Sequence, residues 1–198
     1  MEQDYACKAF ISCSLRPDDE KYVNVVENIL RQLNILPFGT VGRHSASPQN
    51  PTDLMKTNIK EADMVVIVAT PRYNQTDVHN GNSKTGLSEM IQVESGMASI
   101  TEKPIVVFSF ENCDVGNFLP NVTQYINLEY TQEDLNKKWP LIHSLLDSAY
   151  NTAKEKLEES SKSSFSVSNL AKTGLMLYGG FKLFQTILKA TETKKIES

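Results

Sequence analysis

Glu94 is the residue whose type and position most directly suggest chemistry in this sequence. It lies within residues 88–100, where apolar side chains recur at the spacing of one helical face, and it falls near the middle of that face. The apolar residues of the face are Leu87, Met90, Ile91, Met97 and Ala98. An ionised carboxylate in an apolar setting must gain a partner, take up a proton, or serve a ligand in a pocket.

Two interpretations of Glu94 follow from this position. In the first, the carboxylate caps a buried amide or forms an ion pair with Arg16, Arg43 or Arg72, for structural reasons only. In the second, the carboxylate lies in a pocket and takes part in chemistry. The helical pattern alone does not decide between the two.

The elements around Glu94 are predicted from apolar runs that alternate with helical patterns. Apolar runs typical of strands cover residues 8–14, 35–38, 63–70, 103–110 and 124–128. Helical patterns cover residues 22–34, 52–62, 88–100 and 131–159. This alternation predicts an α/β fold, with a flavodoxin-like open parallel sheet of about five strands and helices on both faces.

Polar residues near the strand ends form the predicted binding site. In open α/β sheets, ligands bind beyond the carboxyl ends of the strands, near the place where the helix carrying Glu94 begins. The residues predicted to contact substrate here are Ser12, Ser14, Arg16, Thr70, Arg72 and Tyr73. Ser88 is predicted to cap that helix and to face the same pocket. The preceding segment, residues 71–86, has no periodicity and is long for such a connection, which predicts a functional or mobile loop.

No residue pattern predicts a metal or another bound cofactor. The three histidines are scattered, without the spacing of a zinc site. The three cysteines are odd in number, and Cys7 and Cys13 lie at or within the first strand, which is typical of a reducing compartment. The opening residues MEQDYACKAF are too polar for a signal peptide, so we expect a cytoplasmic protein.

Charge is divided between an acidic body and a basic C-terminal segment. Residues 161–198 contain six lysines against two glutamates, a balance of +4 that leaves −8 on residues 1–160. An acidic body argues against a nucleic-acid partner, because a nucleic-acid groove requires a clustered basic face. The predicted segments are a domain (residues 1–159), a Ser-rich linker (160–168) and a tail (169–198).

The tail is predicted to be an amphipathic helix. Its apolar residues share a wide arc of a helical wheel, and its lysines share the opposite arc. A membrane span needs about twenty apolar residues, whereas Lys172 and Lys182 bracket a much shorter run. Three roles remain open: packing on a partner protein, which we rank first, contact with an anionic membrane, or folding back on the domain.

Four segments occur in an order that is typical of one superfamily. They are FISCS (10–14), ADMVVIVATPRY (62–73), SEMIQVE (88–94) and KPIVVF (103–108). Together they resemble the TIR (Toll/interleukin-1 receptor) superfamily and its nucleoside-deoxyribosyltransferase-like relatives, over about residues 8–130. In the family's helix motif, Ser-x-Trp-Cys-x-x-Glu, Ser88 and Glu94 match the first and last positions, whereas Met90 and Ile91 replace Trp and Cys. The segment ESGMA is similar to the ElGyA segment of the deoxyribosyltransferase branch.

The resemblance implies a function for Glu94. In NAD-cleaving TIR enzymes the matching Glu contacts the ribose next to nicotinamide, and in deoxyribosyltransferases it is the nucleophile on the ribose. The resemblance also implies that residues 39–51 form a loop that covers the pocket and mediates stacking between domains, with Arg43 and His44 as candidate phosphate contacts. It further implies a homo-oligomer or filament and a role in bacterial antiphage defence.

We therefore expect an enzyme that cleaves the N-glycosidic bond of NAD, by hydrolysis or cyclisation, with Glu94 as the catalytic carboxylate and NAD as substrate rather than cofactor. Three alternatives stay open. They are a nucleoside or nucleotide ribosyl transferase, a non-catalytic assembly module, and a membrane-acting effector that works through the tail.

Overall fold

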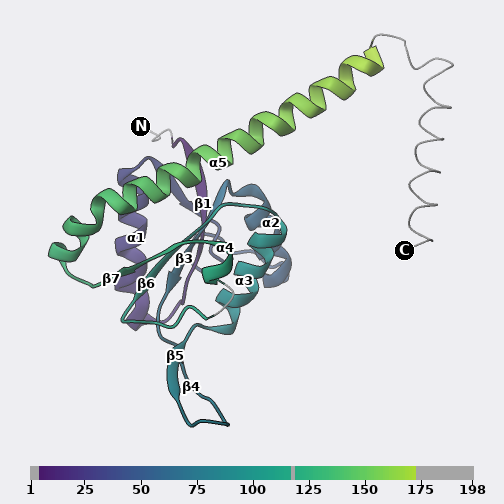
Figure 1. The fold of residues 1–198 in the computed structure, drawn as a ribbon. Helices are drawn as coiled ribbons and strands as arrows, with labels where there is room; N and C mark the ends of the chain where they lie inside the picture. Colours follow the sequence, from purple (N-terminus) through teal and green to yellow (C-terminus); the bar gives the residue numbers. More distant parts are fainter. Residues whose placement is uncertain (1–4, 117–118, 173–198) are drawn as a thin grey trace. The chain divides into compact units, whose positions relative to one another are not determined.

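Five parallel strands form one sheet, whose spatial order is β2-β1-β3-β6-β7 (Figure 1). The computed structural model describes residues 5–116 and 119–172. The strands are β1 (Cys7–Ser12), β2 (Ile35–Phe38), β3 (Met64–Ala69), β6 (Ile105–Phe110) and β7 (Tyr125–Leu128). All four pairings between neighbours are parallel. The predicted open parallel sheet with helices on both faces is therefore confirmed.

The inner strands are apolar throughout because both of their faces are covered. All six residues of β3 are buried, and successive side chains point to opposite faces of the sheet. Met64, Val66 and Val68 belong to one hydrophobic cluster, and the alternate residues of β3 belong to the other. Full burial of one such aliphatic side chain contributes about 1.5–3 kcal/mol to folding.

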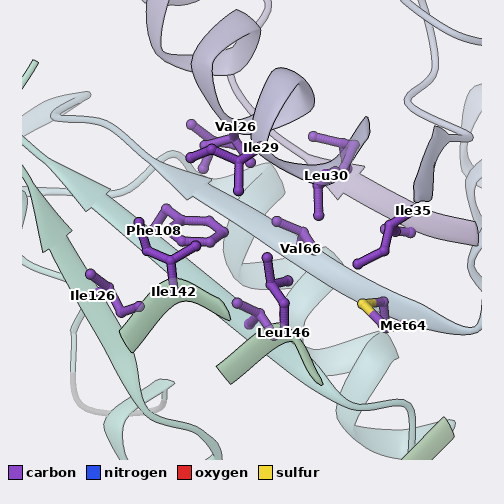
Figure 2. Packing of buried hydrophobic residues seen from close by; sticks show 14 of the residues in the cluster. Val26, Ile29, Leu30, Ile35, Met64, Val66, Phe108, Ile126, Ile142 and Leu146 are labelled. Atoms are coloured by element: carbon purple, nitrogen blue, oxygen red, sulfur yellow. The ribbon is translucent and has the colours of Figure 1, made fainter. Parts of the chain in front are cut away.

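Helix α1 (Glu20–Gln32) and part of helix α5 (Gln132–Lys172) cover the first face. A 3₁₀ turn, η1 (Pro17–Asp19), precedes α1. Figure 2 shows aliphatic side chains of both helices meeting the strands in a continuous cluster. Its labelled members from the helices are Val26, Ile29, Leu30, Ile142 and Leu146.

Helices α2 (Pro51–Glu61), α3 (Glu89–Ile100) and α4 (Leu119–Val122) pack on the second face. Asn50 caps α2, where its Oδ1 accepts a hydrogen bond from the Thr52 amide at 2.9 Å. Ser88 caps α3, where its Oγ accepts a hydrogen bond from the Ile91 amide at 3.3 Å, as predicted. These caps fix where both helices begin, at the edge where the strands end.

The predicted loop 71–86 contains a β-hairpin instead. Strands β4 (Tyr73–Thr76) and β5 (Ser83–Gly86) pair in antiparallel fashion, outside the main sheet. All four residues of β4 are exposed, so no apolar alternation reveals the strand in the sequence. The Asn80-Gly81 pair, with Gly81 at a φ of +72°, lies in the connecting turn and was the one available hairpin signal.

Helix α5 runs past its predicted end at residue 159 and continues through the Ser-rich segment to Lys172. The predicted helix end is wrong because Ser is only mildly unfavourable in a helix, and neither Gly nor Pro occurs between residues 141 and 173. The chain divides into two compact units, residues 1–154 and 155–198. The role of 160–168 as a linker stays a prediction, and tail residues 173–198 lie outside the described residues.

Within residues 5–116 and 119–172, no helix combines the length and the apolar character that crossing a bilayer requires.

We expect a chain of residues 1–159 to fold without the rest. Among the α5 residues whose burial is described, the last buried one is Ala153, so this truncation keeps every described core contact of the helix. A matched chain that ends at residue 140 loses Ile142 and Leu146, and each buried aliphatic side chain that is lost costs about 2–5 kcal/mol. Thermal unfolding followed by circular dichroism should be cooperative for the longer chain only. Non-cooperative melting of residues 1–159 would show that the fold needs the C-terminal segment.

Candidate active site

A cavity of about 630 Å³ opens at the carboxyl ends of β1 and β3. The chain runs from β1 to β2 on one side and later returns to place β3 on the other side of β1. Such a switch in strand order leaves a crevice where α/β proteins bind ligands. The lining residues come from the segments after β1, β2 and β3 and from the first turns of α2 and α3. They are Cys13, Ser14, Leu15, Arg16, Pro17, Thr40, Val41, Pro51, Thr52, Met55, Arg72, Tyr73, Ser88, Glu89, Met90 and Glu94.

Glu94 lies on the wall of this cavity, on the second turn of α3. Its Oε2 accepts a hydrogen bond from the hydroxyl of Ser12, which is the last residue of β1 and has no exposed surface. No described residue forms an ion pair with Glu94, although the ion-pair interpretation required Arg16, Arg43 or Arg72 as its partner. The cavity interpretation of this carboxylate is therefore the one that agrees with the geometry.

Burial makes Glu94 easier to protonate than an ordinary glutamate. Loss of hydration raises its pKa to about 7, against the smaller lowering effect of the Ser12 hydrogen bond. Near neutral pH the carboxyl group is therefore divided between its neutral and ionised forms. A titrating group with this pKa, in an open cavity, is typical of residues that act on a substrate.

Five other residues predicted for the site line the same cavity, namely Ser14, Arg16, Arg72, Tyr73 and Ser88. The Arg16 guanidinium lies 3.7 Å from the Asp18 carboxylate, and both side chains are largely exposed. Arg72 has no ion-pair partner among the described residues, and its Cζ lies 5.8 Å from the centre of the Tyr73 ring. Arg72 is therefore free to bind an anionic part of a ligand, and the Arg16–Asp18 pair is exposed and weak, so Arg16 can exchange Asp18 for such a group.

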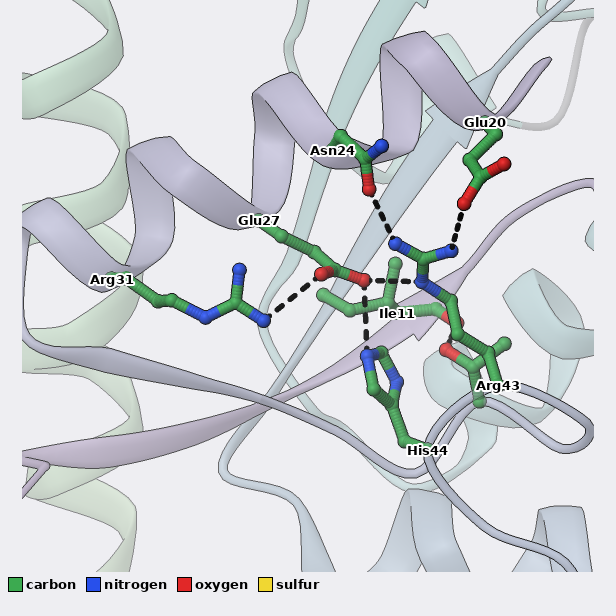
Figure 3. A network of polar contacts seen from close by, with 8 residues as sticks. Ile11, Glu20, Asn24, Glu27, Arg31, Arg43 and His44 are labelled. Atoms are coloured by element: carbon green, nitrogen blue, oxygen red, sulfur yellow. Dashed lines mark hydrogen bonds and ion pairs between the residues drawn. The ribbon is translucent and has the colours of Figure 1, made fainter. Parts of the chain in front are cut away.

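Four predicted contacts do not reach the cavity. Ser12 has no exposed surface and Thr70 is 2% exposed, and neither lines the cavity. Arg43 and His44, predicted to contact phosphate, turn toward Glu27 on α1 (Figure 3). Arg43 Nε donates to Glu27 Oε1 at 2.6 Å, and His44 Nε2 lies 3.0 Å from the same oxygen.

Glu27 joins the loop of residues 39–51 to α1. Arg31 donates a third hydrogen bond, to Glu27 Oε2 at 3.0 Å, so both carboxylate oxygens are occupied. Burial opposes ionisation of Glu27, but the hydrogen bonds from His44, Arg43 and Arg31 outweigh it and lower the pKa to about 2. Arg43 also donates to Asn24 Oδ1 at 2.7 Å (Figure 3). The charges of this loop therefore pair within the fold and hold the loop in place.

Contacts with β1 and α2 also hold the start of the same loop in place. Gly39 has a φ of +80°, and a Cβ there would lie 2.9 Å from both Asn58 Cβ and Phe10 Cδ2. Asn58 Nδ2 donates to the Gly39 carbonyl at 2.6 Å, and Thr40 Oγ1 donates to the Ile11 carbonyl at 2.6 Å. Thr40, which lines the cavity, is thereby held against the end of β1.

The sequence interpretation missed several residues of the cavity wall. Leu15 and Met90 are exposed apolar residues at its rim, and Glu89 is an exposed carboxylate one turn before Glu94. Cys13 keeps its proton because burial, followed by the nearby Glu94 charge, raises the pKa of its thiol to about 12. Their positions directly after β1 and at the start of α3 were the only signal available. Among the described residues no group of His, Cys, Asp and Glu is arranged to hold a metal ion.

The raised pKa of Glu94 predicts a pH-dependent effect of Glu94→Gln on stability. The folded state holds the proton more tightly than the unfolded state, whose Glu pKa is near 4.5. The stabilisation from this proton is complete below pH 4.5 and is lost as pH rises through about 7. Gln does not titrate, so the variant should match wild type at pH 4 and exceed its unfolding free energy at pH 8, by up to about 3 kcal/mol. Urea unfolding at both pH values measures this. A variant less stable than wild type at pH 8 would show that Glu94 is a charged structural partner.

Glu27→Gln should instead destabilise the fold at neutral pH. The substitution leaves Arg43 and Arg31 without their shared counter-charge, which costs about 3–5 kcal/mol when the pair is buried. Because the pKa of Glu27 is lowered, its contribution is present above pH 4.5 and is lost as pH falls toward about 2. Glu20→Gln is the matched control, because that carboxylate lies 3.8 Å from Arg43 but is 61% exposed. We expect the control to change stability by less than about 1 kcal/mol. Equal effects of the two substitutions in urea unfolding would contradict the anchoring role of Glu27.

No family model matches the chain, and a search of curated proteins finds no match. Among solved structures, the chain is similar to a CMP N-glycosidase, BcmB, from Clostridium botulinum. The two share 19% sequence identity with a TM-score of 0.43, over 68% of this chain and 98% of that chain.

Proposed function

We propose that the chain is a TIR-like enzyme that cleaves the N-glycosidic bond of NAD or a closely related nucleotide, with Glu94 as the essential carboxylate. One observation carries the proposal. Glu94 has no ion-pair partner among the described residues, and it lies on the wall of a large cavity at the switch point of the sheet. Burial of a carboxylate without a counter-charge is unfavourable, so its presence is best explained by a substrate that supplies the positive charge.

The chemistry matches that requirement. As the bond between ribose and base breaks, positive charge develops on the ribose ring. A carboxylate held beside the ring in a partly dehydrated cavity stabilises this charge more in the transition state than in the bound substrate, which raises the turnover rate.

The cavity favours a base that leaves without a proton. The lining residues contain no His and no Lys, and the only carboxyl group besides Glu94 is that of the exposed Glu89. A nicotinamide on a pyridinium ribosyl bond departs as a neutral molecule and needs no proton donor. The base of a neutral nucleoside departs as an anion unless an acid protonates it. Besides Glu94, the lining groups that could donate that proton are the exposed Glu89 carboxyl, the Tyr73 phenol and the Cys13 thiol, whose pKa is about 12. NAD, which needs no proton donor, therefore makes the smaller demand on the cavity.

The cationic groups at the mouth suit the phosphates of a dinucleotide. Arg16 and Arg72 approach from the segments after β1 and β3. Thr52 and Ser88, at the first turns of α2 and α3, add helix N-termini that favour negative charge.

Other parts of the proposal rest on the resemblance to TIR proteins alone. These are assembly into a homo-oligomer or filament, a role in antiphage defence, and a partner protein or a membrane bound through the tail. A ribosyl transferase in which Glu94 acts as nucleophile remains the second candidate, because Glu94 Oε1 carries no hydrogen bond from a described residue.

Glu94→Gln should abolish turnover of NAD and leave the fold intact. Removal of the charge opposite the developing ribosyl cation costs a few kcal/mol, which is on the order of a hundredfold or more in rate. Glu89→Gln is the matched control on the same helix, and because Glu89 is exposed we expect its rate to stay within about threefold of wild type. Chromatography of concentrated protein incubated with NAD measures both rates. Equal rates for wild type and Glu94→Gln would exclude the proposed role, and base exchange on nucleosides without loss of NAD would favour the transferase.

A further inference from the structure

Ser12 is a buried residue for which the cavity alone gives no role. It is the last residue of β1, an inner strand held by parallel pairing to both β2 and β3, and its Cα is in register with that of Ile67. Its side chain has no exposed surface and does not line the cavity. In the free protein the Ser12 hydroxyl therefore faces Glu94 and is not part of the cavity wall, whereas the sequence predicted Ser12 as a substrate contact.

The Ser12 hydroxyl donates its one proton to Glu94 Oε2, across 82 positions of sequence. Among the described residues this is the only hydrogen bond that Glu94 accepts, so Oε2 is occupied and Oε1 is left free. Because β1 lies within the sheet, the donor cannot move independently of the core. A flexible glutamate side chain is thereby tied to an inner strand of the sheet.

The other groups around Glu94 do not replace this bond. The titratable or charged residues that share its cavity are Cys13 and Arg16 after β1, Arg72 and Tyr73 after β3, and Glu89 on α3. The cavity residues contributed by the loop after β2 and by α2 carry no charge, being Thr40, Val41, Pro51, Thr52 and Met55. Arg16 and Arg72 are exposed, so water screens their charges. Ser12 is therefore the one buried group that favours the ionised form of Glu94.

We propose that Ser12 is a positioning residue, whose buried hydroxyl fixes the Glu94 carboxylate, favours its ionised form and leaves Oε1 free for the ribose of the substrate. The expected effect of Ser12 on catalysis rests on the proposed function. The expected effect of Ser12 on the charge of Glu94 is independent of that function.

The effect on charge has a definite direction. A hydrogen bond donated to a carboxylate lowers its pKa, and burial raises it. Loss of the Ser12 donor leaves burial unopposed, so the pKa of Glu94 should rise above its present value of about 7. The rate of a reaction that needs the ionised carboxylate should then rise at a higher pH than in wild type. Substrate affinity should stay unchanged because Ser12 does not touch the cavity.

The test compares Ser12→Ala and Ser12→Cys with wild type. Cys keeps nearly the volume of Ser but is a weak donor, so it serves if the Ala variant does not fold. Ser109→Ala is the matched control, because Ser109 is a buried serine of β6, the strand on the other side of β3, and donates to the Cys113 carbonyl at 3.1 Å. Carbon-13 NMR of the glutamate carboxyl groups, with the Glu94 signal assigned by its loss in Glu94→Gln, gives the titration midpoint of Glu94. NAD turnover from pH 5 to 9.5 gives kcat and KM.

Both Ser12 variants should raise the titration midpoint of Glu94 by about one pH unit. At pH 7 kcat should fall about fivefold, at pH 9 it should recover most of the loss, and KM should stay within about twofold. Ser109→Ala should move neither the midpoint nor the pH profile. An unchanged midpoint in both Ser12 variants overturns the inference. A raised midpoint in a protein whose wild type does not cleave NAD supports the control of Glu94 by Ser12 and overturns the proposed function instead.

Discussion

The cavity depends on two carboxylates, Glu27 and Glu94, that lose contact with water on folding and receive different partners. Glu27 is surrounded by three cationic or imidazole side chains, and its pKa falls to about 2. Glu94 receives one neutral hydroxyl, and its pKa rises to about 7. The first arrangement satisfies the charge within the fold and therefore stabilises it. The second leaves the charge unsatisfied in the free protein, so a cationic ligand or a developing cation can complete it.

The two carboxylates depend on each other through the loop of residues 39–51. Glu27 holds Arg43 and His44, while Asn58 and Ile11 hold the backbone of the loop at Gly39 and Thr40. This places Thr40 and Val41 beside the carboxyl end of β1, where they form part of the cavity wall. The same strand ends in Ser12, the partner of Glu94. A satisfied ion-pair network thus shapes the surroundings of an unsatisfied carboxylate.

The fold could be predicted from the sequence because it depends on local patterns. The two-sided burial of β3 produces an uninterrupted apolar run, and the helices show the spacing of their buried faces. The hairpin β4–β5 was missed because its exposed strands carry no apolar alternation. The position of Glu94 at a cavity could also be inferred, since strand ends and helix starts meet at one edge of a parallel sheet.

The partners of the charged residues could not be predicted, because they depend on contacts between distant segments. Arg43 and His44 had the chemistry of phosphate ligands, and only the folded chain shows them bound to Glu27. A wheel of α1 places Glu27 beside Val23 and Leu30, both buried, and the reasoning applied to Glu94 would have marked it as a second carboxylate in need of a partner. Ser12 was predicted as a ligand contact because sequence places it at the correct strand end but does not reveal its burial.

The β4–β5 hairpin has a base that helps to form the cavity and a tip that does not. At its base, Arg72 and Tyr73 line the cavity, and the Arg72 amide donates to the Gly86 carbonyl at 2.8 Å. Lys84 and the Thr85 carbonyl join the hairpin to Asp114, with the ion pair at 2.7 Å. Its tip is exposed and makes no contact with the sheet, and Val78 there is 90% exposed. Length and sequence can therefore vary at the tip, through insertion or deletion, while the geometry of the cavity rim is inherited unchanged.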